Sequence, residues 1–317
     1  MIPIRFFQQG IASGARPRVP GYGRAMIVSA SYRTDIPALY GDWFMKRLKS
    51  GHALVASPYG GKPYRVSLTA GEVAGFVFWT RNIGPFRNHL ADVGTVAPFM
   101  VQFTVTGYPR ALEPGVIETE TAIAQIRALA NSFGPRAVVW RYDPIVETSL
   151  TAPGWHLENF RRLAAALNGY VDEVTISFAQ IYAKTRRNMD RAARDHGFTW
   201  HDPEAGEKQA LATALSEIAK SNGMRMTVCS QPEFTVEGTA PARCIDASRL
   251  SDIAGHTIKA RTKGNRPGCL CNESRDIGAY DSCPQGCAYC YAVSSREKAK
   301  RFLAEHDPEA EALEARL

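Results

Sequence analysis

Six short apolar runs, rich in β-branched and aromatic residues, constrain the fold of this 317-residue chain most strongly. They cover residues 25–31, 75–80, 99–105, 136–142, 173–178 and 224–230. Between them lie segments with apolar residues near every third or fourth position, which is typical of amphipathic helices. These helical patterns occupy residues 37–50, 121–133, 157–169 and 207–221. Strands that alternate with helices predict parallel pairing through right-handed crossovers.

We therefore predict an α/β fold, a partial (βα)6 barrel of the TIM type, with a doubly wound open sheet as the alternative. Residues 52–58 and 63–68 flank "YGGK" and predict an inserted hairpin. The chain divides into an N-terminal extension (1–24), the partial barrel (25–230) and a cysteine-rich segment (231–317). We expect this last segment to cap the barrel mouth and to end in a charged helix, which "DP" at 307–308 interrupts.

The chain has seven cysteines, and six of them follow residue 231. Its N-terminus has no apolar run of signal-peptide length, and no later stretch approaches the roughly 20 apolar residues of a membrane span. We therefore expect a cytoplasmic protein with no membrane partner. Because that compartment keeps thiols reduced and an odd number cannot all pair, metal or redox chemistry is favoured over disulfides.

Three of the cysteines, Cys283, Cys287 and Cys290, have the spacing C-x3-C-x2-C in "CPQGCAYCYA". This spacing is typical of a loop that gives three thiolates to a 4Fe-4S cluster and leaves the fourth iron open. An open iron can be chelated by S-adenosylmethionine (SAM), and an electron from the cluster can then break a carbon–sulfur bond. A structural zinc site, completed by Cys269 or Cys271, is the alternative.

The other four cysteines are Cys229, Cys244, Cys269 and Cys271. Four thiolates saturate a 4Fe-4S cluster, so these residues are candidates for an auxiliary cluster. The alternative is that Cys229 and Cys244 are buried apolar thiols. The expected cofactors are therefore SAM and one 4Fe-4S cluster, with a second cluster if the four cysteines meet.

The stretches "SASYRTDIPALY", "VFWTRN", "QFTVTGY", "VVWRYDPI" and "CLCNESRDIGAYDSCPQGCAYCYA" together resemble a bacterial family known only as a domain of unknown function. The resemblance runs from about residue 26 to residue 293. The C-terminal cysteine cluster of that family is similar to the cluster of radical SAM enzymes. In that larger superfamily the cysteine loop normally follows the first barrel strand, whereas here that position holds "SASYRTDIP". Contacts to SAM therefore cannot be transferred by sequence order.

Polar residues just after the apolar runs are the other site candidates, because chemistry in parallel barrels gathers at the carboxyl ends of the strands. The candidates for catalysis are Arg33, Asp35, Arg141 and Asp143. Guanidinium groups suit carboxylate or phosphate, so the substrate is expected to be anionic. An internal ion pair between Arg141 and Asp143 is the alternative. The candidates for cofactor binding are Tyr289, Arg81 and Trp79, whose aromatic rings could also be core residues.

The favoured hypothesis is a radical SAM-like enzyme that takes its electron from a donor such as flavodoxin or ferredoxin. The first alternative is an iron–sulfur electron carrier or sensor that never binds SAM. The second is a zinc-stabilised barrel that binds nucleic acid, suggested by a formal charge of +7 and by basic runs at 184–196 and 259–266. The first of these runs mixes acids with bases at helical spacing, which favours a solvated helix.

Overall fold

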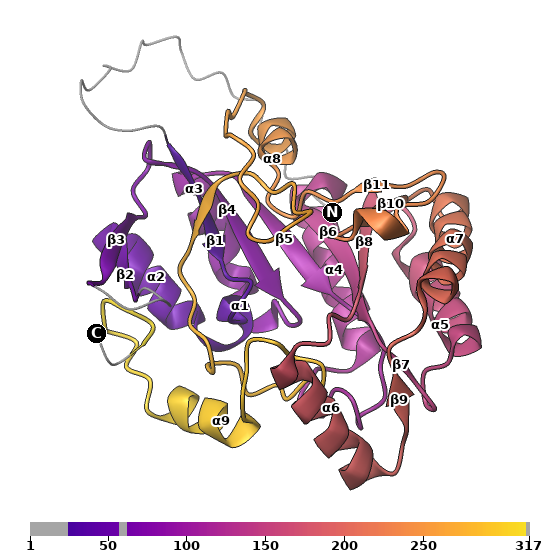
Figure 1. The fold of residues 1–317 in the computed structure, drawn as a ribbon. Helices are drawn as coiled ribbons and strands as arrows, with labels where there is room; N and C mark the ends of the chain where they lie inside the picture. The colour runs from indigo at the N-terminus through magenta and orange to yellow at the C-terminus, as the bar shows by residue number, and fades with distance from the viewer. Residues whose placement is uncertain (1–24, 57–61, 315–317) are drawn as a thin grey trace.

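The computed structural model describes residues 25–56 and 62–314 (Figure 1). The expected N-terminal extension lies outside the described residues, as does most of the turn of the expected hairpin. Among the described residues, no helix is both long enough and apolar enough to cross a bilayer.

One large sheet organises the chain. It has eight strands in the order β11-β10-β8-β6-β5-β4-β1-β12, and every pairing is parallel. The strands are β1 (Met26–Ala30), β4 (Val73–Thr80), β5 (Phe99–Thr104), β6 (Val138–Ile145), β8 (Glu173–Phe178), β10 (Arg225–Val228), β11 (Ala240–Pro241) and β12 (Ser274–Asp276). The prediction of an α/β fold with six parallel strands is confirmed, because each of the six apolar runs overlaps one of these strands.

The finer prediction, a partial (βα)6 barrel of the TIM type, is not confirmed, because no sheet closes within the described residues. β11 and β12 are the two edges. Both come from the segment 231–317, which therefore extends the sheet as well as covering it. Between β1 and β11 the strands follow one another in chain order without reversal. Right-handed crossovers that all advance in one direction place their helices on the same face of the sheet.

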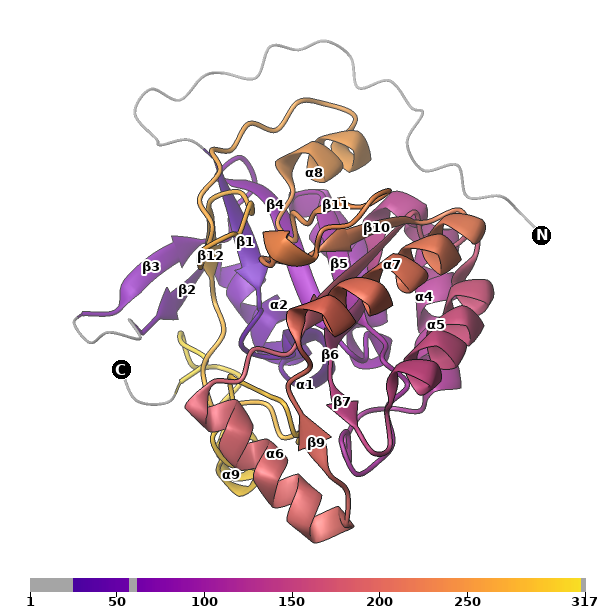
Figure 2. The ribbon, with the colours of Figure 1, turned by 45° about the vertical axis from the view of Figure 1, so that its right-hand side comes forward.

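The helices divide between two faces and two ends of the sheet. We call the face that packs on α2, α4, α5 and α7 the helical face, and the opposite face, which packs on residues 242–271, the cysteine face. In both views α8 lies at one end of the sheet, and α6 lies with α9 at the other (Figures 1 and 2). The α-helices are α1 (Ile36–Leu39), α2 (Gly41–Ser50), α3 (Leu90–Val96), α4 (Thr119–Phe133), α5 (Pro153–Leu167), α6 (Ala183–His196), α7 (Ala205–Ser221), α8 (Ala247–Ala254) and α9 (Arg296–Ala304).

The smaller elements lie outside the large sheet. The expected hairpin is present as antiparallel β2 (His52–Val55) and β3 (Tyr64–Ser67). β7 (Glu147–Thr148) and β9 (Trp200–His201) form a second antiparallel pair. The helix expected over 37–50 is divided at Tyr40 into α1 and α2. The expected terminal helix ends at Ala304, before the Asp-Pro pair.

Packing on the helical face explains why the apolar runs become strands. Alternate residues of each strand point to this face. The ring centroid of Phe44 in α2 lies 5.3 Å from that of Phe78 and 5.5 Å from that of Phe86. All three side chains are fully buried. Each buried phenylalanine contributes about 1.5–3 kcal/mol to folding, so this core anchors the β1–β4 part of the sheet beside the cysteine loop.

Candidate metal centre

The loop that carries Cys283, Cys287 and Cys290 follows β12, and β12 is held against β1 by the carboxylate of Asp276. Three backbone register pairs join the two strands, from Ile27 and Ser274 to Ser29 and Asp276. The two oxygens of Asp276 accept five hydrogen bonds. The donors are the hydroxyls of Ser29 (2.8 Å) and Ser31 (2.6 Å), the backbone N–H groups of Tyr32 (3.0 Å) and Gly278 (3.0 Å), and Nε of Arg33 (3.0 Å).

The predicted site residue Arg33 therefore forms a buried ion pair with Asp276, which sequence reasoning missed. A polar segment of three residues carries no apolar signal for a strand. β12 exists because the edge of β1 offers a ladder and because Asp276 satisfies the buried donors around it.

Asp35, another predicted site residue, connects the ends of β1 and β4 to the cysteine loop. Its carboxylate accepts from Thr80 Oγ1 (2.7 Å), from the backbone N–H of Arg81 (2.9 Å) and from Gln285 Nε2 (2.7 Å). It also caps the N-terminus of α1. Burial raises the pKa of Asp35, although these hydrogen bonds oppose the rise. Because Gln285 lies between Cys283 and Cys287, this carboxylate helps to set the path of the loop.

A second set of contacts holds the start of the loop. Thr34 Oγ1 donates to the carbonyl of Ala279 (2.7 Å) and contacts the hydroxyl of Ser282 (2.7 Å). The phenol of Tyr40 donates to the carbonyl of Ser282 (2.6 Å). Cys283 comes next in the chain, so the loop leaves β12 along a path set by buried hydrogen bonds to α1 and its flanking residues.

The three thiols of the motif lie at the end of the sheet near α6, close enough for the charge of one to affect the pKa of another. Each residue keeps part of its surface in solvent, but the protein packed around each sulfur controls its protonation. Burial raises the pKa of Cys283, and so do the charges of Asp35 and Cys287. Burial raises the pKa of Cys287 to about 12, and the guanidinium of Arg81 opposes that rise. Burial also raises the pKa of Cys290. Without a cation these thiols stay protonated at neutral pH, and a metal centre would supply the charge that makes them thiolates.

The three motif thiols have the right chemistry for a metal centre, but they are not arranged around one metal position. Three soft sulfur donors share one loop, and each of the three residues is partly exposed. Within the ranges 25–56 and 62–314, however, no three His, Cys, Asp or Glu side chains converge as they do around a single bound metal ion. Three thiolates that bind three different irons of one cluster do not need to converge on one point.

The predicted cofactor residues Arg81 and Tyr289 belong to one buried network. Arg81 Nη1 donates to Glu113 Oε1 (2.8 Å), and the phenol of Tyr289 also donates to that oxygen. Arg81 Nη2 donates to the phenol oxygen, and the ring of Tyr289 packs edge-on against Tyr108. Glu113 was missed by sequence reasoning, because it lies in an irregular loop nine residues beyond β5. The network fixes Tyr289, which directly precedes Cys290.

Arg141 and Asp143 form the internal ion pair that was the alternative interpretation of these residues. Arg141 Nε donates to Asp143 Oδ1 (2.9 Å), and Nη1 donates to Gln102 Oε1 (3.1 Å) and to Cys244 Sγ (3.0 Å). The guanidinium also lies 4.9 Å from the ring of Trp79, whose Nε1 donates to Ser29 Oγ. A direct role of either charged residue on a substrate therefore stays a prediction.

The remaining four cysteines lie together on the cysteine face. Cys229 Sγ and Cys244 Sγ are 3.5 Å apart, and the thiol of Cys271 interacts with the thiols of Cys244 and Cys269. The sequence divides the seven cysteines into three and four, and the structure groups them in the same way. Metal binding by either group stays a prediction.

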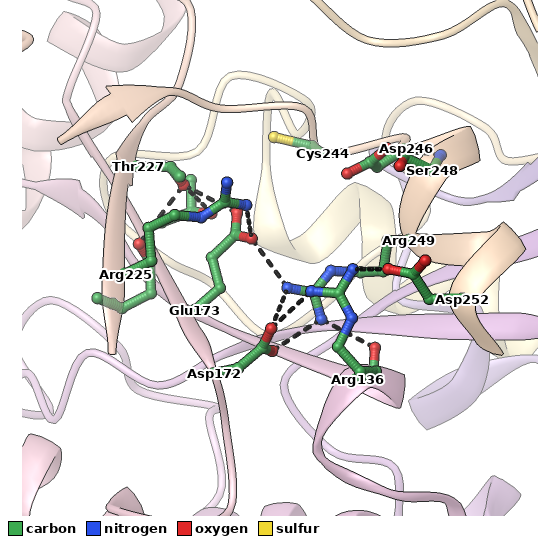
Figure 3. A network of polar contacts seen from close by, with 12 residues as sticks. Arg136, Asp172, Glu173, Arg225, Thr227, Cys244, Asp246, Ser248, Arg249 and Asp252 are labelled. Atoms are coloured by element: carbon green, nitrogen blue, oxygen red, sulfur yellow. Dashed lines mark hydrogen bonds and ion pairs between the residues drawn. The ribbon is translucent and has the colours of Figure 1, made fainter. Parts of the chain in front are cut away.

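An ion-pair network that the sequence did not reveal holds α8 against the start of β8 and the turn before β6 (Figure 3). Arg249 of α8 is almost fully buried and donates to Asp172 Oδ1 (2.9 Å) and Glu173 Oε2 (2.8 Å) at the start of β8. Arg136 donates to Asp172 Oδ2 (2.6 Å) from the turn before β6. These partners are far apart in sequence, so no local pattern links them.

The two basic runs differ in their surroundings. In α6 only Thr185 and Met189 are buried, which agrees with a solvated helix, and Asn188 donates to the carbonyl of Val293 (3.1 Å) just beyond the motif. In the run 259–266, Arg261 and Lys263 both pair with Glu273. This pairing leaves less free positive charge for a nucleic-acid backbone.

Comparison with known proteins identifies a family without assigning an activity. No curated protein matches the chain, and no solved structure matches it. A family model described as "Domain of unknown function (DUF1848)" matches residues 27–292, from the second residue of β1 to beyond β12 and the three motif cysteines. The chain therefore belongs to the DUF1848 family.

Proposed function

We propose that this protein is a radical SAM-like enzyme. In this proposal Cys283, Cys287 and Cys290 hold a 4Fe-4S cluster with one open iron. One observation carries the proposal: the cysteine loop follows β12, a parallel strand paired with β1 at the edge of the sheet. In spatial order β12 is therefore the first strand of the series β12-β1-β4-β5-β6-β8-β10, although it is the last in sequence.

This placement removes the difficulty that the sequence raised. In the superfamily the cysteine loop normally follows the first barrel strand, and here it follows the strand that is first in space. The proposed architecture is accordingly a partial TIM-type barrel in which the first strand is supplied by the C-terminal part of the chain. A sheet needs its strands side by side but does not require them to follow in a particular chain order.

A cluster held by Cys283, Cys287 and Cys290 and reduced by a flavodoxin- or ferredoxin-like donor would supply the electron for reductive cleavage of SAM and the radical chemistry that acts on the substrate. The residues of this chain prepare that step. Asp276, with Arg33, fixes the strand before the loop, and Asp35 fixes Gln285 within it.

Two cations near the motif favour an anionic cluster, and the carboxylates of Asp35 and Glu113 oppose them. Arg81 lies close to the thiols of Cys287 and Cys290, and Lys184 of α6 lies close to Cys290. Both cations favour the thiolate forms that bind iron. The buried hydrogen bond from Tyr289 to Glu113 fixes the backbone of the motif between Cys287 and Cys290, and this helps to orient the two sulfurs.

The test is anaerobic reconstitution with iron and sulfide, followed by dithionite and SAM. We expect a brown protein that releases 5'-deoxyadenosine and methionine. Cys283→Ala, Cys287→Ala and Cys290→Ala should each abolish this release and remove the SAM-sensitive electron paramagnetic resonance signal. Tyr291→Phe is the matched control, because it changes the next residue and removes only the bond from its phenol to the carbonyl of Tyr32. It should keep the iron content of the unsubstituted protein.

Two results would overturn the proposal. A reducible cluster that never cleaves SAM would instead support an electron carrier or sensor. Stoichiometric zinc that is lost in the three alanine variants, with no iron at these residues, would support a structural zinc site.

A further inference from the structure

Four thiols form a continuous chain of contacts on the cysteine face. Their hydrogen-bond partners differ from those of the motif thiols. The order is Cys229, Cys244, Cys271 and Cys269, and the first pair has an Sγ–Sγ distance of 3.5 Å. The first three residues are buried, and Cys269 is partly exposed. Isolated buried cysteines need no such grouping, so the chain of contacts requires an explanation.

Hydrogen-bond donors surround these sulfurs. Arg141 Nη1 donates to Cys244 Sγ (3.0 Å), Arg266 Nη2 donates to Cys229 Sγ (3.5 Å), and the backbone N–H of Ile245 donates to Cys271 Sγ (3.4 Å). Among the described residues, Arg266 has no carboxylate within ion-pair distance. A guanidinium directed at sulfur with no carboxylate partner is better satisfied by a thiolate than by a neutral thiol.

The backbone around the four thiols is firmly held. The N–H of Cys229 donates to the carbonyl of Ile176 (2.9 Å), and Gln102 Nε2 donates to the carbonyl of Cys244 (2.8 Å). The carbonyl of Cys271 accepts from the N–H of Lys263 (2.9 Å). Three separate segments of the chain therefore present sulfur to one place from fixed positions, as a preorganised metal site requires.

We propose that Cys229, Cys244, Cys269 and Cys271 bind a single metal ion, zinc or iron, as a tetrahedral tetrathiolate centre. A metal ion with bonds of about 2.3 Å to four sulfurs holds neighbouring sulfurs about 3.8 Å apart. The 3.5 Å contact between Cys229 and Cys244 is close to that spacing. In a 4Fe-4S cluster each thiolate binds a different iron, so its sulfurs stand farther apart than in a direct contact. The geometry thus favours one ion over the auxiliary cluster expected from the sequence.

Binding would require one local adjustment. The four sulfurs form a chain rather than a closed tetrahedron, which agrees with the absence of a finished metal site among the described residues. Protonated thiols that donate to one another adopt such a chain, whereas a cation would draw the end thiol, Cys269, inward. Cys269 is the partly exposed member, so the adjustment falls on the side chain with the most freedom.

The consequence for the fold is a staple between distant segments. The ion would join the end of β10 to the segment before α8 and to residues 269–271. β12 begins three residues after Cys271 and carries Asp276, which holds the motif loop. A metal at this site would therefore support the position of the motif without taking part in its chemistry.

The experiment uses the full chain with Cys283, Cys287 and Cys290 all changed to Ala, so its outcome does not depend on the proposed function. We expect about one zinc or iron per chain by mass spectrometry, with no matching acid-labile sulfide. Replacement of the ion by Co²⁺ should produce strong thiolate-to-metal absorption in the near ultraviolet. The ratio of zinc to iron identifies the ion.

In that background Cys244→Ser should abolish metal binding, and Ser230→Ala, whose side chain lies beside Cys229, should retain it. X-ray absorption of the bound metal provides a readout without a further substitution and should show four sulfur neighbours at about 2.3 Å. About four irons with equal sulfide would show that the four thiols hold a cluster and would overturn the proposal. Absence of metal together with failure to bind Co²⁺ would overturn it equally.

Discussion

Asp276→Asn tests whether a single carboxylate mounts the cysteine loop on the sheet. An asparagine keeps the size of the side chain but replaces one acceptor oxygen with an NH2 donor. Oδ2 accepts from the fixed backbone N–H of Tyr32, and Oδ1 accepts from Arg33 and from the backbone of Gly278. Whichever way the amide turns, a donor meets a donor. The change also leaves the buried guanidinium of Arg33 without its counter-charge.

Breaking a buried ion pair by removing one partner costs about 3–5 kcal/mol. We expect this cost to appear as local opening of β12, because only three register pairs hold that strand to the sheet. At about 1.4 kcal/mol for each tenfold change, amide exchange over residues 274–282 should accelerate by at least about 100-fold. Hydrogen exchange with mass spectrometry measures this directly, and amides of the central strands β5 and β6 should not change.

Glu273→Gln is the matched control, since this acid directly precedes β12 but pairs with the exposed side chains of Arg261 and Lys263. Exposed pairs contribute at most about 1 kcal/mol, so its effect on exchange should be less than about tenfold. Equal exchange in the two variants would refute the argument that Asp276 holds the strand.

Three further predictions concern the scaffold. Burial lowers the pKa of His156 to about 4, so the fold favours its neutral form, and its contribution to stability is complete above pH 6.5 and lost as pH falls toward 4. Between pH 7 and pH 5 the loss should be about 2 kcal/mol, and calorimetric or denaturant unfolding of His156→Gln should show a pH dependence smaller by that amount. In Gly278→Ala the new Cβ would lie 2.1 Å from Ser31 Oγ, so we expect a loss of about 1–3 kcal/mol in denaturant unfolding; the same change should cost less when it is made in a Ser31→Gly background, and an equal cost in both backgrounds would contradict the steric cause. Arg249→Met should cost about 3–5 kcal/mol because it leaves buried Glu173 short of positive charge, whereas Arg225→Met, which removes the exposed partner of the same carboxylate, should cost less than about 1 kcal/mol in the same assay.

The local pattern of residues determined the main strands and their direction. Runs such as 75–80 carry apolar residues on both faces, and a strand of this kind is stable only when it is covered on both sides, as β4 is. The helical spacing of 121–133 likewise matches α4, although the helix begins two residues earlier. Burial and period act within one segment, so these features could be predicted without knowledge of the neighbours.

The motif spacing also separated three cysteines from the other four, since C-x3-C-x2-C is contained in one loop. In the sequence, the only reason to group Cys229 and Cys244 with Cys269 and Cys271 was that four cysteines remained after the motif. Their meeting depends on β10, the segment before α8 and the approach to β12 reaching one place. Contacts between such segments are decided only when the whole chain packs.

Tertiary structure alone decided that β12 is a strand and that it lies beside β1. Its three residues, Ser274–Asp276, have no apolar pattern, and their partners are more than 240 positions earlier in the chain. The edge of β1 supplies unpaired backbone groups, and the donors around Asp276 supply charge and hydrogen bonds that only a buried carboxylate satisfies. The sequence contained the cysteine loop, but its position relative to the sheet arises from these long-range bonds, because a short polar segment becomes ordered only where a folded surface provides its partners.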